Sequence, residues 1–509
     1  MNKNNIFHHR HILCVILIGI TLSCAPYTAA HATEQATQNA PAQKQENAAF
    51  KPLFNAESMT LDNGMQVIAI PNHRIPVVTH MVWYKTGGAD EQRGKTGVAH
   101  LLEHMMFKGS ENVPPGEFSK IIKTMGGNDN AFTSLDYTAY FQSVSVDHLK
   151  DVMTMEADRM RGLLLPENHV PSERDVVIEE RRQVTENDAQ AHFAEHLNAA
   201  LFLNHRYGRP VIGWMQEIEN IDRNDLQTFH DTYYAPNNAI LIVSGDITLD
   251  TLKPLAEEIY GTLPRKDIPP RTWRAVPDMV GTVNMVHHDA RVRQTSALHM
   301  MRAPSFRQDR TAALALQLIE NILSDGAASR LYKKLVVENK MASSVSFSYS
   351  GAYWSNGRIW FAATPLDGVD PADIIAAYRE ELLNVVDGDI TDTELQDAKT
   401  RLIDRAVFAR DSLSGPAMIV GRALVTGSTL DDVEYWARDL NAITQDDIRE
   451  AAQDYLDPRT HAGITGFLYP EDSVNEDAPE HITEKSSQQA TEQVIEQVTE
   501  QATKQEEEQ

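Results

Sequence analysis

The sequence predicts an α+β protein built from two domains of similar architecture. Strand-like stretches alternate with stretches of helical periodicity along residues 49–470. The same order of elements occurs twice, in two parts of about 200 residues each, and a proline-rich stretch separates the parts. A chain of 509 residues is long enough for several domains with cores of their own. These observations together predict a duplicated α+β domain.

The composition is that of a globular, acidic protein. Apolar residues make up 42% of the chain and charged residues 23%, and the formal net charge is −26. This acidic excess argues against nucleic acids and anionic lipids as partners, because both bind basic surfaces. With only two cysteines, Cys14 and Cys24, the chain is not a disulfide-stapled scaffold.

Residues 1–32 have the three parts of a secretory signal peptide. Basic residues precede an apolar run over 12–25 that is too short to span a membrane, and small residues follow at Ala30 and Ala32. We therefore expect a periplasmic or secreted protein without a transmembrane span in its mature form. Acylation of Cys24 as a lipoprotein is the alternative, although the aliphatic residue usual three positions upstream is absent.

Two polar segments flank the predicted domains. Residues 33–48 are rich in Gln and Ala and predict a flexible leader. Residues 471–509 hold 12 acids and 2 lysines, a net charge of −10, and contain a four-residue repeat. Their apolar content is too low for a core, so we interpret this tail as disordered, with partner binding as the alternative.

Residues 49–265 form the first predicted domain. Its strand-like stretches, the third of them a strand or a hairpin, lie at 65–70, 77–84, 131–144 and 239–245. Its helical stretches lie at 97–107, 116–125, 147–163 and 172–188. Ser172 is the expected N-cap of the last helix, with Asp175 completing a capping box.

Residues 266–280 form the predicted linker, within a stretch that contains four prolines between residues 261 and 280. The second predicted domain covers 281–470 and repeats the element order without a residue-level repeat. Its strand-like stretches lie at 281–300 and 344–365, and its helical stretches lie at 308–323, 371–386 and 391–410.

A short pattern in the first domain, His100-Leu-Leu-Glu103-His104, carries the chemistry. On a helix, His100 and His104 lie one turn apart on one face, so both imidazoles can reach one metal ion. Glu103 flanks that face, where its carboxylate can take a proton from a metal-bound water that attacks a carbonyl. This is the zinc-protease pattern H-E-x-x-H in reverse. The alternative is a pair of surface histidines beside a glutamate.

A catalytic zinc site needs a third protein ligand and an open position for water. The candidates lie in an acidic helical stretch, where Glu173 and Glu180 are seven residues apart and share one face. From the residues alone, Glu179 and Glu180 are nearly equal candidates for the ligand. The alternative for the whole cluster is a solvated helix face.

The pattern His100-x-x-Glu103-His104, followed 76 residues later by Glu180, resembles the inverted-zincin peptidases of the pitrilysin/insulinase family. The similarity is to its mitochondrial processing peptidase-like bacterial branch and extends over residues 50–470. Three further stretches match: Gly126-Gly127-x-x-Asn130-Ala131-x-Thr133-x-x-Asp136, Tyr207-Gly208-Arg209-Pro210 and Pro236-Asn237-Asn238-Ala239. The resemblance implies two homologous α/β-sandwich domains that form a clamshell.

The resemblance also implies roles for individual residues. His100, His104 and Glu180 would bind one zinc ion per chain, Glu103 would be the catalytic base, and Glu173 would support the ligands from the second shell. An edge strand would pair with the backbone of an extended peptide substrate. Its residues are Asn130, Ala131, Phe132 and Thr133. The alternative is that Asn130 caps a turn and Phe132 belongs to the core.

The chain departs from the family pattern in the second domain, which contains no H-x-x-E-H pattern. Self-sufficient members supply there an Arg and, seven residues on, a Tyr, which bind substrate and stabilise the oxyanion. The stretch Ser329–Tyr332 sets the register, and Val336 and Ser343 stand at these two positions. Valine donates no hydrogen bond and serine is too short to replace a phenol, so an isolated chain should be strongly impaired.

Three explanations remain open. We favour a heterodimer in which this chain carries zinc and a homologous partner subunit supplies the Arg/Tyr pair. The second is a local misalignment, with Arg330, Tyr332 or Tyr349 in these roles. The third is a weakly active or non-catalytic zinc-binding subunit that binds peptides or acts as a scaffold. The sequence thus predicts a zinc metalloendopeptidase that hydrolyses peptides or unfolded polypeptide segments.

Overall fold

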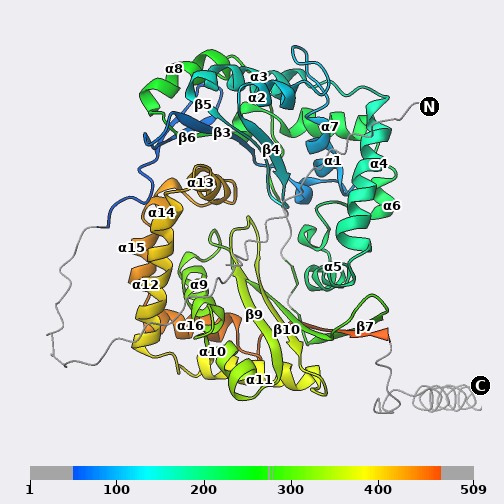
Figure 1. Ribbon diagram of the computed structural model, residues 1–509, viewed down its shortest axis with the longest axis vertical. Helices are drawn as coiled ribbons and strands as arrows, with labels where there is room; N and C mark the ends of the chain where they lie inside the picture. The colour runs from blue at the N-terminus through cyan, green and yellow to red at the C-terminus, as the bar shows by residue number, and fades with distance from the viewer. Residues whose placement is uncertain (1–49, 273–275, 278, 472–509) are drawn as a thin grey trace, which may run out of the picture. The chain divides into compact units, whose positions relative to one another are not determined.

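Two mixed β-sheets, one in each half of the chain, organise the structure (Figure 1). It is a computed structural model that describes residues 50–272, 276, 277 and 279–471. The predicted signal peptide and leader, and the predicted tail from residue 472 on, lie outside the described residues. In the described part of the chain, no helix combines the length and the apolar character needed to cross a bilayer.

The first sheet has six strands in the order β1-β2-β6-β3-β5-β4. Their bounds are β1 Glu57–Thr60, β2 Gln66–Pro71, β3 Val77–Tyr84, β4 Asn128–Thr133, β5 Thr138–Ser145 and β6 Ala239–Gly245. β2 and β6 run parallel, and the other neighbours are antiparallel. The three predicted strands are confirmed, and the alternating stretch at 131–144 is a hairpin formed by β4 and β5.

The helices of the first half are α1 Val98–Met105, α2 Phe118–Thr124, α3 Leu149–Gly162, α4 His169–Arg181, α5 Ala189–Phe202, α6 Met215–Ile218, α7 Arg223–Tyr233 and α8 Leu249–Ile259. The helices predicted at 97–107, 116–125 and 147–163 are therefore confirmed with shorter bounds. Between α8 and the first strand of the second half, the described residues form neither helix nor strand.

The predicted start of α4 is wrong. The helix begins at His169, so Ser172 lies inside its first turn, where its Oγ donates a hydrogen bond to the His169 carbonyl at 2.9 Å. Pro171 does not prevent the earlier start, because the first N–H groups of a helix have no partner within the helix. After Arg181 the chain continues as a single π-helical stretch, η3 Arg182–Glu186.

The second sheet has five strands in the order β7-β11-β8-β10-β9. Their bounds are β7 Val283–Asp289, β8 Ser296–Ala303, β9 Ala342–Ser350, β10 Gly357–Pro365 and β11 Ile464–Pro470. The helices of this half are α9 Arg310–Ser324, α10 Arg330–Tyr332, α11 Pro371–Val386, α12 Asp392–Ala409, α13 Gly415–Val425, α14 Leu430–Glu434, α15 Trp436–Ala442 and α16 Gln445–Tyr455. Each predicted helix of this half is present, and each strand-like stretch contains two strands.

The two sheets repeat one topology. The order β2-β6-β3-β5-β4 of the first sheet corresponds strand by strand to β7-β11-β8-β10-β9 of the second. In both sheets the first pair is parallel and the following pairs are antiparallel. The predicted α+β class is confirmed, and the similar order of elements noted in the sequence corresponds to this repeated strand order.

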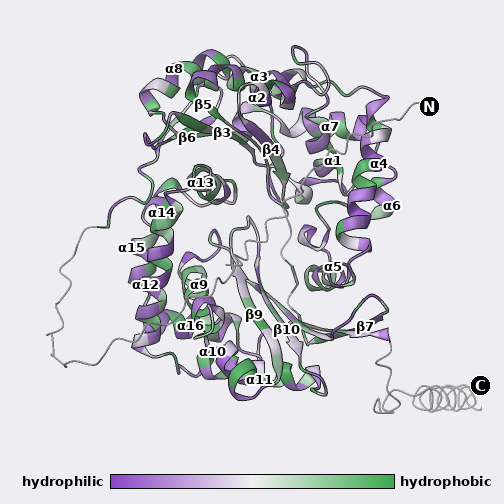
Figure 2. Ribbon diagram, in the orientation of Figure 1, coloured by the Kyte–Doolittle hydropathy of each residue, from purple (hydrophilic) through white to green (hydrophobic). Residues whose placement is uncertain are grey.

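Each sheet is covered on one face by a helix from the other half of the chain. On the first sheet, α13 places Ala417 and Val420 in an apolar cluster with Trp83 of β3. On the second sheet, α5 places Phe193 and Leu197 against β8 and β11. Figure 2 shows apolar residues gathered on β3, β6 and α13. Both halves therefore contribute side chains to both cores, because each apolar face of a sheet must be covered by another element.

The close approach of α13 to the first sheet depends on Gly421. A Cβ atom at this position would overlap the indole ring of Trp83, which is fully buried. We predict that Gly421→Ala lowers the free energy of unfolding by about 1–3 kcal/mol, because a packed core resists added volume. Thermal or urea unfolding measures this, and Gly281→Ala, whose Cβ would lie in open space, is the control. Equal stability of the two variants would contradict the packing described here.

Candidate metal centre

Helix α1 presents its two histidines to α4. The helix starts after Gly97, which has a φ of +95°. Gly97 also lies so close to the backbone of Ile212 that a Cβ atom would be 2.6 Å from the Ile212 carbonyl oxygen. Glycine adopts this left-handed conformation without strain, so the turn fixes where α1 begins. His100 and His104 then lie on one face with ring centroids 4.9 Å apart.

Glu180 of α4 faces both imidazoles. Its Oε1 lies 3.5 Å from Nε2 of His100, and its Oε2 lies 3.4 Å from Nε2 of His104. Glu179 points away, with a side chain that is 55% exposed and contacts Arg182. The geometry therefore distinguishes two glutamates that the residue pattern left nearly equal.

The three groups fit a tetrahedrally bound zinc ion. Bonds of 2.0–2.1 Å at tetrahedral angles separate two ligand atoms by about 3.3–3.4 Å. The two contacts of Glu180, which are made by its two different oxygens, come close to this value, and one ligand atom from each of the three residues lies within 4.8 Å of the others. Two imidazole nitrogens and one carboxylate leave a fourth position open, as in catalytic zinc sites.

Glu173 fixes the orientation of His104. The His104 Nδ1 donates to Glu173 Oε1 at 3.1 Å, and Lys108 Nζ lies 2.6 Å from Glu173 Oε2. Because Nδ1 is held in this way, Nε2 of the same ring is directed toward Glu180. A carboxylate that orients a histidine ligand is the usual outer support of a zinc site. Glu173 thus contacts His104 at the ring nitrogen that does not face Glu180.

The protonation of the two histidines differs because their surroundings differ. Burial and the neighbouring His104 lower the pKa of His100 to about 4. Burial also acts to lower the pKa of His104, but hydrogen bonds to Glu173 and Glu180 outweigh it and raise the pKa to about 9. Since a ligand imidazole is neutral, a metal ion bound at this candidate site would displace the proton of His104.

Glu103 lies beside the three candidate metal ligands and contacts a different element of the fold. Its Oε2 accepts a hydrogen bond from Thr133 Oγ1 of β4 at 2.6 Å. Burial raises the pKa of Glu103 to about 7, although the bond from Thr133 opposes this shift. A carboxylate with a pKa near neutrality suits a group that must both accept and return a proton.

The predicted substrate-binding residues lie in β4, one of the two edge strands of the first sheet. Ala131 donates its N–H to the side-chain oxygen of Asn130 at 2.9 Å. Phe132 lies with its ring 5.3 Å from that of Trp83, in the apolar cluster on the far face. The strand edge thus lies next to Glu103, while the side chain of Phe132 belongs partly to the core.

Comparisons with known proteins agree with this geometry. Residues 66–214 match the model of the insulinase family, peptidase family M16, and residues 220–402 match the M16 inactive domain. The zinc protease PqqE of Helicobacter pylori is 30% identical over 421 residues, which are 81% of this chain and 93% of that protein. The chain belongs to the insulinase family of peptidases. The prediction of a zinc protease is thereby confirmed.

Other family members are similar at greater distance. The beta subunit of the mitochondrial-processing peptidase of Lentinula edodes is 25% identical, over 79% of this chain and 87% of that protein. A crystal structure of a Helicobacter pylori protease superposes with a TM-score of 0.77 at 29% identity, over 83% of this chain and all of that one. The first half of the periplasmic protease PqqL from Escherichia coli has a TM-score of 0.68 at 23% identity, over 83% and 93% of the two chains.

The two residues that depart from the family pattern, Val336 and Ser343, make contacts within the second half of the chain. Val336 packs against the core of the second half, and Ser343 Oγ donates to the Thr364 carbonyl at 3.3 Å. Neither side chain can therefore take the role that the resemblance predicts for an Arg or a Tyr at these positions.

Two of the proposed substitutes are engaged elsewhere. Arg330 forms an ion pair with Glu394 at 2.7 Å and contacts two further acids of the second half. The hydroxyl of Tyr349 is buried and donates to the Pro304 carbonyl at 2.7 Å. These contacts give both side chains structural roles, which weakens the explanation by local misalignment.

The chain contains a second H-x-x-E-H pattern, His192-Phe-Ala-Glu195-His196, which the sequence analysis missed. It lies on α5, where Glu195 accepts two hydrogen bonds from Arg181 at 2.7 and 3.0 Å. Among the described residues, His100, His104 and Glu180 are the one group whose three ligand atoms converge. The pattern by itself therefore does not define the site, because the third ligand comes from another helix.

The two patterns provide a matched comparison for metal binding. We predict that His100→Ala or His104→Ala reduces bound zinc from about one ion per chain to near zero, because two protein ligands hold zinc poorly. His192→Ala and His196→Ala should leave the zinc content unchanged. Plasma mass spectrometry of the dialysed proteins measures this. If only the α5 variants lost zinc, the metal would bind at α5, and the assignment to α1 and α4 would be wrong.

Proposed function

We propose that this chain is a zinc metalloendopeptidase that hydrolyses peptides or unfolded polypeptide segments. The observation that carries the proposal is the convergence of His100, His104 and Glu180, with the buried carboxylate of Glu103 beside them. A general base next to a three-ligand site with an open position is the arrangement that peptide hydrolysis requires. Family membership supports the same conclusion.

In this mechanism the side chains of the site divide the work. The two histidines and Glu180 would hold zinc, which would supply a Lewis acid for the peptide carbonyl and for water. Glu103 accepts a proton from the attacking water and returns it to the amine nitrogen of the leaving group. Thr133 donates a hydrogen bond that orients Glu103 for both transfers.

The substrate is proposed to lie along β4. An extended peptide that pairs with the backbone of residues 130–133 places a scissile bond next to Glu103, since Thr133 links the strand to that carboxylate. Backbone pairing depends little on the side chains of the peptide. The proposed substrates are therefore extended or unfolded segments rather than peptides of one particular sequence.

Glu103→Gln tests the role of the base. The amide cannot accept a proton, so we expect cleavage of a mixed peptide pool to fall by about 10²–10⁴-fold while zinc stays bound. Glu179→Gln, on the exposed face of α4, is the control and should retain both activity and zinc. Undiminished cleavage by the Glu103 variant would exclude this mechanism.

We further propose that the chain works as the zinc-bearing subunit of a heterodimer. Val336 and Ser343 stand where the resemblance expects the Arg and Tyr that bind substrate and stabilise the oxyanion, so a homologous partner is proposed to supply them. We also propose that the two homologous α/β-sandwich halves form a clamshell, with the peptide lying along β4. The repeated sheet topology supports two homologous halves.

A partner subunit should restore the missing oxyanion donor. We predict that adding a homologue that lacks H-x-x-E-H but keeps the Arg/Tyr pair raises kcat by about 10²–10³-fold, and that a chelator abolishes this gain. Progress curves on the same peptide pool, with each subunit alone and with the mixture, measure it. Peptide binding without cleavage in every mixture would instead favour a non-catalytic binding subunit.

Export from the cytoplasm is proposed from the predicted signal peptide over residues 1–32. The structural similarity to the periplasmic protease PqqL is consistent with this location. Sequencing the amino terminus of the mature protein would identify the cleavage site, expected after Ala32, or a lipid-modified Cys24.

A further inference from the structure

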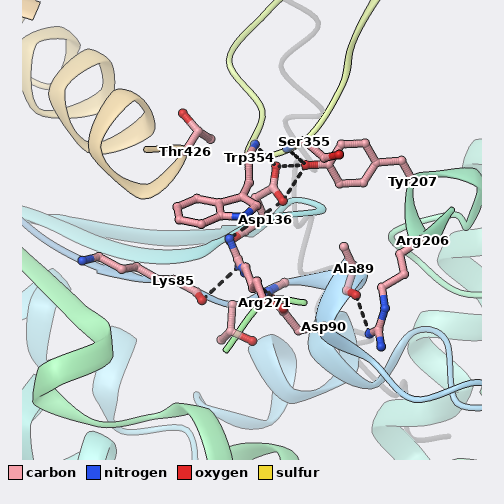
Figure 3. Close-up of polar contacts among 12 residues, drawn as sticks. Lys85, Ala89, Asp90, Asp136, Arg206, Tyr207, Arg271, Trp354, Ser355 and Thr426 are labelled. Atoms are coloured by element: carbon pink, nitrogen blue, oxygen red, sulfur yellow. Dashed lines mark hydrogen bonds and ion pairs between the residues drawn. The ribbon is translucent and has the colours of Figure 1, made fainter. Parts of the chain in front are cut away.

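The tips of two corresponding hairpins meet at a polar contact between the two halves (Figure 3). One tip connects β4 to β5 and carries Asp136, and the other connects β9 to β10 and carries Trp354 and Ser355. Tyr207, which follows α5, and Arg271, from the predicted linker, complete the contact. We call these five residues the hairpin joint.

Asp136 is the acceptor at the centre of the hairpin joint. Its carboxylate is 1% exposed and accepts the Tyr207 hydroxyl at 2.7 and 2.8 Å. The same carboxylate accepts the N–H of Trp354 at 3.0 Å, and the N–H of Ser355 donates to the Tyr207 oxygen at 2.9 Å. Two backbone N–H groups of the second half are therefore satisfied by side chains of the first.

Arg271 of the predicted linker contributes to the same contact. Its guanidinium forms an ion pair with Asp90 at 2.7 Å and donates to the Asp136 carbonyl oxygen. It also lies 5.5 Å from the ring centroid of Trp354, which contacts Arg307 at 4.4 Å. The positive charge of Arg271 thus offsets part of the cost of burying carboxylates at this contact, because a buried charge without a partner is strongly destabilising.

The hairpin joint lies three residues from a contact of the candidate active site. The turn after β4 is closed by the Ser134 N–H, which donates to Tyr137, and by the Gly88 N–H, which donates to Ser134. Thr133 directly precedes this turn, and its hydroxyl donates to Glu103. A shift of the hairpin tip therefore moves the residue that orients the proposed base.

We propose that Asp136 is a positioning residue of the peptidase. It holds the β4–β5 tip against the second half of the chain, so that Thr133 stays in register with Glu103 and the β4 edge stays aligned for a peptide. It acts through Thr133 and contacts neither the metal ligands nor the proposed substrate edge. The inference rests on the proposed function, which assigns the base and the edge.

The test compares Asp136→Asn and Tyr207→Phe with Glu394→Gln. The control variant weakens a hydrogen-bonded ion pair of the second half that is remote in sequence from the hairpin joint. Hydrogen exchange of the intact protein is measured over residues 128–138 and over α1, together with zinc content. We expect exchange over 128–138 to become at least tenfold faster in the two joint variants alone, with α1 and bound zinc unchanged.

Kinetics with the peptide pool and partner subunit give the second readout. We expect kcat to fall at least tenfold in Asp136→Asn, with a smaller change in KM. Thr133→Val provides a double-mutant cycle: if Asp136 acts through Thr133, then adding Asp136→Asn to Thr133→Val causes little further loss. Fully additive losses would show that Asp136 acts by another route and would overturn the proposal.

The two readouts separate failure of this inference from failure of the proposed function. An unchanged exchange rate over 128–138 in both joint variants would overturn the positioning role, whatever the activity. Faster exchange in a protein that never cleaves peptides would support the coupling but refute the peptidase function. If Asp136→Asn does not fold, Tyr207→Phe decides, because it removes a single hydroxyl and keeps the carboxylate with its bond from Trp354.

Discussion

The contact on which this molecule depends is that of Glu180 with the Nε2 atoms of His100 and His104. Several ionisable groups are largely removed from water here, and most of them are paired with a group of opposite charge. Lys108 balances Glu173, Glu173 holds His104, and the site leaves one buried carboxylate with a raised pKa, that of Glu103. The same burial that makes the cluster costly makes it suitable for proton transfer.

That cluster is held in place by an arrangement in which neither half is complete alone. Each sheet has one face covered by helices of its own half and one covered by a helix of the other half. The reciprocal positions of α5 and α13 bury Trp83 on one side and the β8 and β11 strands on the other. The hairpin joint adds directed hydrogen bonds to this apolar packing. Directionality matters because apolar contact alone tolerates small shifts, whereas hydrogen bonds to backbone N–H groups do not.

Much of the fold could be predicted from periodicity. The strands at 77–84 and 239–245 and the helix at 371–386 have the predicted bounds, because their apolar patterns are regular and their ends are marked. The start of α4 could not be predicted in this way. The serine that follows the proline resembles an N-cap, although the helix begins earlier and contains both residues. The same limitation applies to Arg330, which was one of three alternatives for the missing donor pair and whose side chain contacts three acids of the second half.

The sequence by itself determined the chemistry that the site can perform: two histidines and a glutamate spaced for one helix face, and acids in a later helix. Residue spacing alone did not determine which acid faces the histidines, a choice that only the family resemblance made, or that the second H-x-x-E-H pattern at His192 lacks a converging third ligand. It also gave no sign that Asp136 meets the opposite half. Local spacing fixes which side chains share a face, but only tertiary packing decides which faces meet. A metal centre assembled from two helices and a joint assembled from two hairpins are both properties of that packing.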